Sequence, residues 1–106
     1  MGLEQTQNDK NNPLNGITEL LDCKWTLEIL GTLQKGSQRY SQIEFAIQGI
    51  SPSELSARMR QLIRQGVVNR NVHANQPAAT NYELTNKGLA LQDVLYAIAK
   101  YRNIVE

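Results

Sequence analysis

The chain has 106 residues, with 11 Lys and Arg against 10 Asp and Glu, and 41% of its residues are hydrophobic. This length fits one compact domain with a real core, while one cysteine, Cys23, and one histidine, His73, exclude an internal disulfide and a structural zinc site. No apolar run approaches the roughly 20 residues that are needed to cross a bilayer. We therefore expect a cytoplasmic protein that does not associate with membranes. We also expect it to bind no cofactor.

The N-terminal end of the chain differs in composition from the rest. Residues 1–12 are rich in Asn, Gln and Asp and predict a disordered polar arm. Pro13 can open a short helix, whose apolar side carries Ile17, Leu20 and Leu21. We expect this helix to pack as a lid or dimer arm on a folded domain of residues 13–106.

Two further helices are predicted before residue 50. The first takes Asp22 as its N-cap and ends near Gly36, and its core side carries Trp25, Ile29, Leu30 and Leu33. The next covers residues 38–47 and ends at Gly49, and its inward side carries Tyr40, Ile43, Ala46 and Ile47. Only a few residues then separate it from the following helix.

That following helix has the clearest start in the chain. Ser51, Pro52 and Glu54 predict a capping box with proline at the first helical position. Helical spacing then sorts the residues into two sides with Ser56 and Arg58 between them. The core side carries Leu55, Met59, Leu62 and Ile63, and the outward side carries Ser53, Ala57, Arg60, Gln61 and Arg64. Residues 51–80 hold four arginines against one acidic residue, so the basic charge of the chain is concentrated here.

Gly66 ends this helix, and the remaining chain predicts a β-ribbon and a final helix. The stretches VVNRNV and NYELT read as two short strands flanking the loop HANQPAAT. Thr85 can cap the last helix, whose apolar residues are Leu89, Leu91, Val94, Leu95, Ile98, Tyr101 and Val105. These residues cover more than one side of the helix, which is more than one small core requires. The excess favours contact with a partner helix.

This order of elements predicts an α+β fold that is mostly helical: a winged helix-turn-helix with a two-stranded wing and a C-terminal dimerisation helix. The helix that contains Arg39, the link through Gly49 and the helix opened by Ser51 have the spacing of a helix-turn-helix. In such units the second helix enters the major groove. Small residues at its first turns allow close approach to base edges, and Arg60 can reach guanine or phosphate.

An ordered set of motifs carries a family resemblance over about residues 13–100. The motifs are Lys-Trp-Thr-Leu, Gly-x-x-Arg-aromatic, Gly-Ile-Ser, Leu-Ser-x-Arg, Gly-hydrophobic-Val-x-Arg, Pro-x-x-x-x-Tyr-x-Leu-Thr and Gly-x-x-Leu. In this pattern the chain resembles the HxlR-type winged-helix transcriptional regulators, which are related to the MarR group. The resemblance implies a homodimer that binds inverted-repeat operators in double-stranded DNA, near the nucleoid, and it implies no enzyme activity.

The resemblance and the charge pattern together give a set of expected DNA contacts. The resemblance places the reading helix at residues 53–60, a phosphate contact at Arg39 and the wing at residues 73–76. The full expected set is Arg39, Ser51, Ser53, Ser56, Ala57, Arg58, Arg60, Arg64, Arg70, His73, Asn75 and Gln76.

Two departures from the family pattern affect what can be transferred. Many relatives carry a redox-sensing Cys-Pro pair where this chain reads Asn12-Pro13, and Cys23 stands where relatives usually have glycine. Cys23 can be a redox sensor, since a nearby lysine and helix start favour its thiolate, or a small packing residue. The wing loop contains no lysine or arginine, so we expect a weak contribution from it, with support from Arg70.

Several alternatives remain open at this point. The same fold can serve as a winged-helix protein-interaction module that binds no DNA, and enzymatic use of Cys23 with His73 is a distant third, because no orienting partner follows from the sequence. Arg58 can contact DNA or form an intramolecular salt bridge. Trp25 and Tyr82 can be imagined as a ligand-stacking pair, but packing is the ordinary role of a tryptophan on a core helix face.

Overall fold

A computed structural model describes residues 25–105 of the chain, with side chains through residue 101. The elements are α3 (Thr26–Gln34), β1 (Gln38–Arg39), α4 (Tyr40–Ala46), α5 (Pro52–Arg64), β2 (Val68–Asn71), a 3-10 turn (Pro77–Ala79), β3 (Asn81–Leu84) and α6 (Asn86–Val105). The polar arm of residues 1–12, the helix opened by Pro13, and Cys23 lie outside the described residues.

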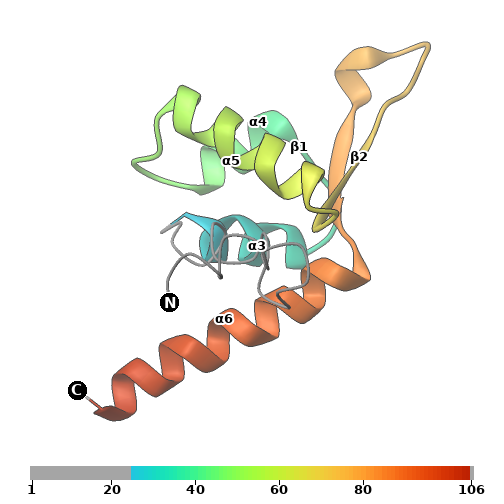
Figure 1. Ribbon diagram of the computed structural model, residues 1–106. Helices are drawn as coiled ribbons and strands as arrows, with labels where there is room; N and C mark the ends of the chain where they lie inside the picture. The colour runs from blue at the N-terminus through green and yellow to red at the C-terminus, as the bar shows by residue number, and fades with distance from the viewer. Residues whose placement is uncertain (1–24, 106) are drawn as a thin grey trace, which may run out of the picture.

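The elements form the winged helix-turn-helix that the sequence predicts. In Figure 1, α3 lies between a layer formed by α4 and α5 and the long helix α6. The ribbon of β2 and β3 projects past the end of α5, and α6 runs away from the base of the ribbon beneath α3. Helix α5 with the ribbon and the long helix α6 therefore lie on opposite sides of α3.

The core is built around the apolar sides of α3 and α5. Ile29, Leu30 and Leu55 are fully buried, as expected from their helical spacing. The other buried apolar side chains are Leu33, Ile43, Ile47, Met59, Leu62, Val67, Val68, Tyr82, Leu91 and Leu95. Trp25 packs against this cluster, which confirms its predicted packing role.

The sheet has one more strand than predicted. Its order is β1-β3-β2 with antiparallel pairs, and β1 pairs Gln38 with Tyr82 and Arg39 with Asn81. The prediction that the third helix starts at Gln38 is wrong, because these two residues are extended and α4 begins at Tyr40. The backbone N–H of Arg39 donates to Oε1 of Gln42 at 2.7 Å, which caps the helix start two residues later than expected.

Three finer predictions about helix faces and ends are also wrong. Ala46 was expected to face inward and is exposed, while Gln61 was expected to face outward and is 8% exposed. Helix α3 begins at Thr26 with Trp25 in the N-cap position, so Asp22, which itself lies outside the described residues, is not the cap of this helix. Because a helical pattern gives only an average direction, neighbouring elements decide such flanking positions.

The junction between α5, the ribbon and α6 is held by Thr85. Its side-chain oxygen accepts from the backbone N–H of Gly88 at 3.0 Å, which confirms the predicted N-cap of α6. The same hydroxyl donates to the carbonyl oxygen of Gly66 at 2.6 Å. Gly66 has a φ of 77° and ends α5 as predicted. One side chain therefore joins the end of the reading helix to the start of α6.

Gly88 is required at this junction because the backbone of Val67 passes directly over it. A Cβ atom at residue 88 would overlap the carbonyl oxygen of Val67. By contrast, a Cβ at Gly31, inside α3, would meet nothing within 4 Å. The two helical glycines thus differ in what a methyl group would encounter.

We expect Gly88→Ala to lower the free energy of unfolding by about 2 kcal/mol or more, because the α6 start must move away from Val67. Gly31→Ala is the matched control and should be neutral or stabilise by up to about 1 kcal/mol, since alanine is the better helix former. Urea unfolding followed by circular dichroism measures both. Equal effects of the two substitutions would contradict the close approach at residue 88.

Candidate nucleic-acid interface

Helix α5 begins at a cap that also ties it to α3. The Ser51 hydroxyl oxygen accepts from the backbone N–H of Glu54 at 3.1 Å, as predicted. The Glu54 carboxylate does not complete the capping box at the backbone of Ser51; it accepts from the Trp25 indole at 3.3 Å and from the Ser51 hydroxyl at 3.4 Å. The first turn of the reading helix is therefore anchored to the beginning of α3.

The outward side of α5 is small near its start and basic near its end, as predicted. Ser53, Arg60 and Arg64 are exposed, while Ser56 and Ala57 are half-buried. Of the expected outward residues only Gln61 lies in the interior. A helix with small residues at its first turns can approach a surface closely before its long basic side chains make contact.

Arg58 lies on the flank of α5, where its helical position predicts it. Its side chain is half-buried, and its Nε has no hydrogen-bond partner among the described residues. No described carboxylate pairs with it either, so the salt-bridge alternative gains no support from this part of the chain. A guanidinium held part-way inside the protein is less available to DNA than those of Arg60 and Arg64.

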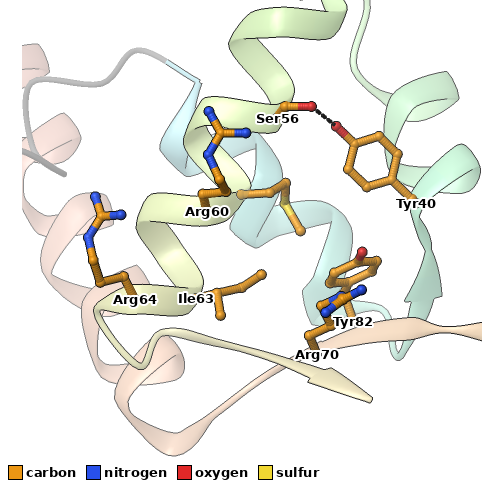
Figure 2. Close-up of a pocket in the computed structure, with 8 residues that line it drawn as sticks. Tyr40, Ser56, Arg60, Ile63, Arg64, Arg70 and Tyr82 are labelled. Carbon is orange, nitrogen blue, oxygen red and sulfur yellow. Dashed lines mark hydrogen bonds between the residues drawn. The ribbon is translucent and has the colours of Figure 1, made fainter. Parts of the chain in front are cut away.

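A groove of about 450 Å³ separates α5 from the sheet. Its apolar lining comes from Met59, Ile63 and the Tyr82 ring, and its basic lining comes from both α5 and β2. Figure 2 shows the residues that line it, of which the polar and charged ones are Tyr40, Ser56, Arg60, Arg64, Arg70 and Tyr82. The reading helix and the wing thus share one concave basic surface.

A second hollow of about 370 Å³ adjoins this groove near β1 and the end of the wing loop. It shares Tyr40, Arg70 and Tyr82 with the first groove and adds Arg39 and residues next to the wing loop. The structure therefore brings together four arginines from three elements: Arg39, Arg60, Arg64 and Arg70. None of them forms an ion pair with a carboxylate within residues 25–101, so their charge is open to an anionic partner.

The ribbon has two chemically different faces. Arg70 and Tyr82 are directly paired in the ladder and both line the grooves. On the other face the Asn71 amide donates to Asn81 at 2.9 Å and to Glu83 at 3.1 Å. This alternation follows from the period of two in a strand, and it puts the Glu83 carboxylate on the opposite face from Arg70.

The wing loop carries the remaining expected contacts. His73, Asn75 and Gln76 are all exposed, and the loop closes with a 3-10 turn in which Thr80 donates to the Pro77 carbonyl oxygen at 2.7 Å. Exposure makes these side chains available but adds no positive charge. The structure leaves the three residues apart from the grooves lined by the arginines.

Sequence reasoning missed the part that Tyr40 and Tyr82 play at this surface. Tyr40 was predicted to face the core, and Tyr82 was considered only as a stacking partner of Trp25. Both line the two grooves, and the Tyr40 hydroxyl lies 2.9 Å from the Ser56 hydroxyl. The residue type could have indicated this role. A tyrosine that packs on a core carries a hydroxyl that needs a hydrogen-bond partner. For Tyr40 that partner is Ser56 on the polar side of α5.

The surface and the fold define the class of this protein as a winged helix-turn-helix transcriptional regulator, and comparisons with known proteins specify its family. Residues 20–105 match the model of the HxlR-like helix-turn-helix. The chain belongs to this family. Its described residues form no group of His, Cys, Asp and Glu that could hold a metal, and no described helix is long and apolar enough to span a membrane.

Relatives and solved structures agree with this assignment. The chain is 39% identical over 88 residues to an HTH-type transcriptional regulator of Synechocystis, covering 83% of this chain and 65% of that protein. It is 40% identical over 83 residues to the HTH-type transcriptional regulator YvaP of Bacillus subtilis, covering 78% and 77%. Both relatives are named as HTH-type transcriptional regulators.

The solved structures include close matches in fold. The diamide-treated YodB of Bacillus subtilis superposes with a TM-score of 0.73 at 32% identity, covering 80% of this chain and 84% of that one. A possible HxlR family transcriptional factor of Thermoplasma volcanium superposes with a TM-score of 0.70 at 32% identity, covering 89% and 84%. The winged-helix arrangement described here is therefore the one its relatives adopt.

We expect Ser51→Ala to lower the free energy of unfolding by about 1 kcal/mol, because the N–H of Glu54 loses its cap. Ser53→Ala, in the same turn, removes only a side-chain contact at 3.3 Å and should change stability by less than about 0.5 kcal/mol. Thermal unfolding by circular dichroism compares the two. A larger loss for the Ser53 variant would contradict the assignment of the cap.

Proposed function

We propose that this protein is a sequence-specific DNA-binding regulator that acts as a homodimer on an inverted-repeat operator. The observation that carries the proposal is one groove that is lined by Arg60 and Arg64 of α5 and by Arg70 of the wing. Membership of a family of helix-turn-helix regulators supports DNA as the anion. Such a regulator works in the cytoplasm, at the nucleoid.

In the proposed complex α5 enters the major groove from its capped end. Ser53, Ser56 and Ala57 allow close approach, and Arg60 makes the principal base contact because it is the first exposed arginine of the helix. Ser51 lies at the helix N-terminus, where a phosphate binds well. Two symmetry-related copies of α5 would then reach half-sites about ten base pairs apart.

We assign the remaining arginines to contacts with the phosphates of the DNA backbone. Arg39, Arg64 and Arg70 line the hollows beside α5, where a sugar-phosphate strand would run, and Arg58 adds to them from the flank. The loop contacts are weaker. His73, Asn75 and Gln76 are exposed but carry no fixed positive charge, so we assign them a minor part in minor-groove binding.

The dimer is proposed to form through α6 together with the N-terminal helix opened by Pro13, which lies outside the described residues. Along α6, Leu91 and Leu95 are buried against the core. A second apolar row remains exposed, with Val94 at 47%, Ile98 at 43% and Tyr101 at 65%. An apolar row at three- and four-residue spacing is what a partner helix needs.

We expect Arg60→Ala to weaken operator binding by about 1–3 kcal/mol and to relax base preference at one position, while the protein stays folded. Arg64→Ala and Arg70→Ala should weaken binding to all sequences and each reduce the slope of log affinity against log salt by about 0.9. Fluorescence anisotropy with the DNA upstream of its own gene, at several salt concentrations, measures these effects.

Lys35→Ala is the control for this series, because Lys35 is an exposed cation at the end of α3 and lines neither groove. It should leave affinity and salt slope nearly unchanged. A wild-type protein that binds no DNA in a salt-sensitive, sequence-preferring way would favour the protein-interaction module instead, and the proposed function would then be wrong.

We expect the double substitution Val94→Glu and Ile98→Glu to convert a dimer into a folded monomer, since two carboxylates would be buried in the interface without partners. Lys100→Glu, an exposed charge change on the same helix, should leave the dimer intact. Sedimentation equilibrium gives the mass, and circular dichroism checks the fold. A wild-type monomer, or a double variant that remains dimeric, would contradict the α6 interface.

A further inference from the structure

The side chain of Tyr40 joins the reading helix to the wing. Its ring packs edge-on against Tyr82 of β3, with centroids 6.0 Å apart and planes at 63°. Its hydroxyl lies 2.9 Å from the Ser56 hydroxyl on α5. Figure 2 shows this hydrogen bond at the end of the groove that the arginines line. Tyr40 therefore holds a fixed position relative to both parts of the proposed DNA surface.

The hydrogen bond restricts what Ser56 can offer to DNA. A free serine hydroxyl rotates, and it donates or accepts according to the base it meets. In the Tyr40–Ser56 pair, two hydroxyls share one bond, so one hydrogen is used between them and one remains. A phenol is the stronger donor of the two, so the arrangement in which Tyr40 donates to Ser56 is favoured. The hydrogen of Ser56 then points away from Tyr40.

The geometry of the reading helix makes this restriction relevant to recognition. Ser56 is half-buried, lies one turn before the exposed Arg60, and lines the same groove. In the major groove, guanine presents two acceptors, while cytosine presents only a donor. When Tyr40 donates, the Ser56 oxygen has already used one of its two lone pairs and its hydrogen is left for an outside partner. Ser56 then favours a base that presents an acceptor, whereas a free serine has no such bias.

We propose that the Tyr40 hydroxyl is a specificity-determining group: it sets Ser56 as a hydrogen-bond donor toward DNA and so fixes the base preference at the position that Ser56 faces. The inference rests on the DNA reading proposed above. Tyr40 itself is a positioning residue, because it acts through Ser56.

The test is a selection of binding sites from random DNA with the full chain and four variants. Tyr40→Phe keeps the ring against Tyr82 and removes only the hydroxyl. It should reduce the preference for acceptor-bearing bases at one position of each half-site by about three- to tenfold, the worth of one hydrogen bond. Ser56→Ala should remove that preference, and the double variant should equal Ser56→Ala, because the two groups act as one unit.

Tyr96→Phe is the matched control, since it also removes one tyrosine hydroxyl but lies exposed on α6 and lines neither groove. It should leave the base preference unchanged. Salt slopes should be equal in all variants, and circular dichroism should show that each is folded. A merely structural role for Tyr40 would lower affinity for all sequences equally and would move no single position.

Two outcomes overturn the inference while leaving the proposed function intact: a base preference that Tyr40→Phe does not change, and additive effects of Tyr40→Phe and Ser56→Ala. A wild-type protein that selects no sequence at all would overturn the proposed function and this inference together. The wild-type selection thus separates the two failures.

Discussion

The burial of one side of α5 is the constraint on which the rest of the structure depends. Leu55 and Leu62 are fully buried and Met59 is 2% exposed, and each contributes about 2 kcal/mol by leaving water. Because a helix is rigid, fixing this side also fixes the direction of the opposite side, where the small and basic residues stand. The core therefore positions the backbone of the proposed reading surface, and only its exposed side chains are left to be ordered when a partner binds.

The ends of α5 carry the next set of constraints. At the start, Ser51 caps the helix and Glu54 ties it to Trp25 of α3. At the end, the carbonyl oxygen of Gly66 accepts from Thr85, which caps α6. The reading helix is thus joined at one end to the central helix and at the other to the helix proposed for dimerisation. The Thr85 side chain, the bond from the Thr85 backbone N–H to the Val67 carbonyl oxygen, and the close approach of Gly88 to Val67 hold the end of α5 and the start of α6 together.

Much of this could be predicted from the sequence, because capping residues, helical spacing and turn glycines act locally. The start of α5 at Pro52, its core side, the two ribbon strands and the Thr85 cap all follow from such local signals. The strand at Gln38 and Arg39 could not be predicted, because it exists only where β3 lies beside it. Gln61 was misplaced for the same reason: its side chain is covered by the surrounding fold and not by its own helix.

The candidate site, too, could be predicted from the sequence only in part. The basic residues of α5 were visible in the sequence as a local excess of arginine, but their convergence with Arg39 and Arg70 depends on the antiparallel pairing of β3 with both other strands. Tyr82 pairs with Arg70 on one side and with Gln38 on the other, so its ring lies on the same face of the sheet as the Arg70 side chain. That ring supports Tyr40, and Tyr40 meets α5 at Ser56. A chain with a formal net charge of only +1 thereby places four arginines around two adjoining hollows. Since screening by salt acts over about 8 Å under physiological conditions, it is this local arrangement, and not the net charge, that an approaching polyanion encounters.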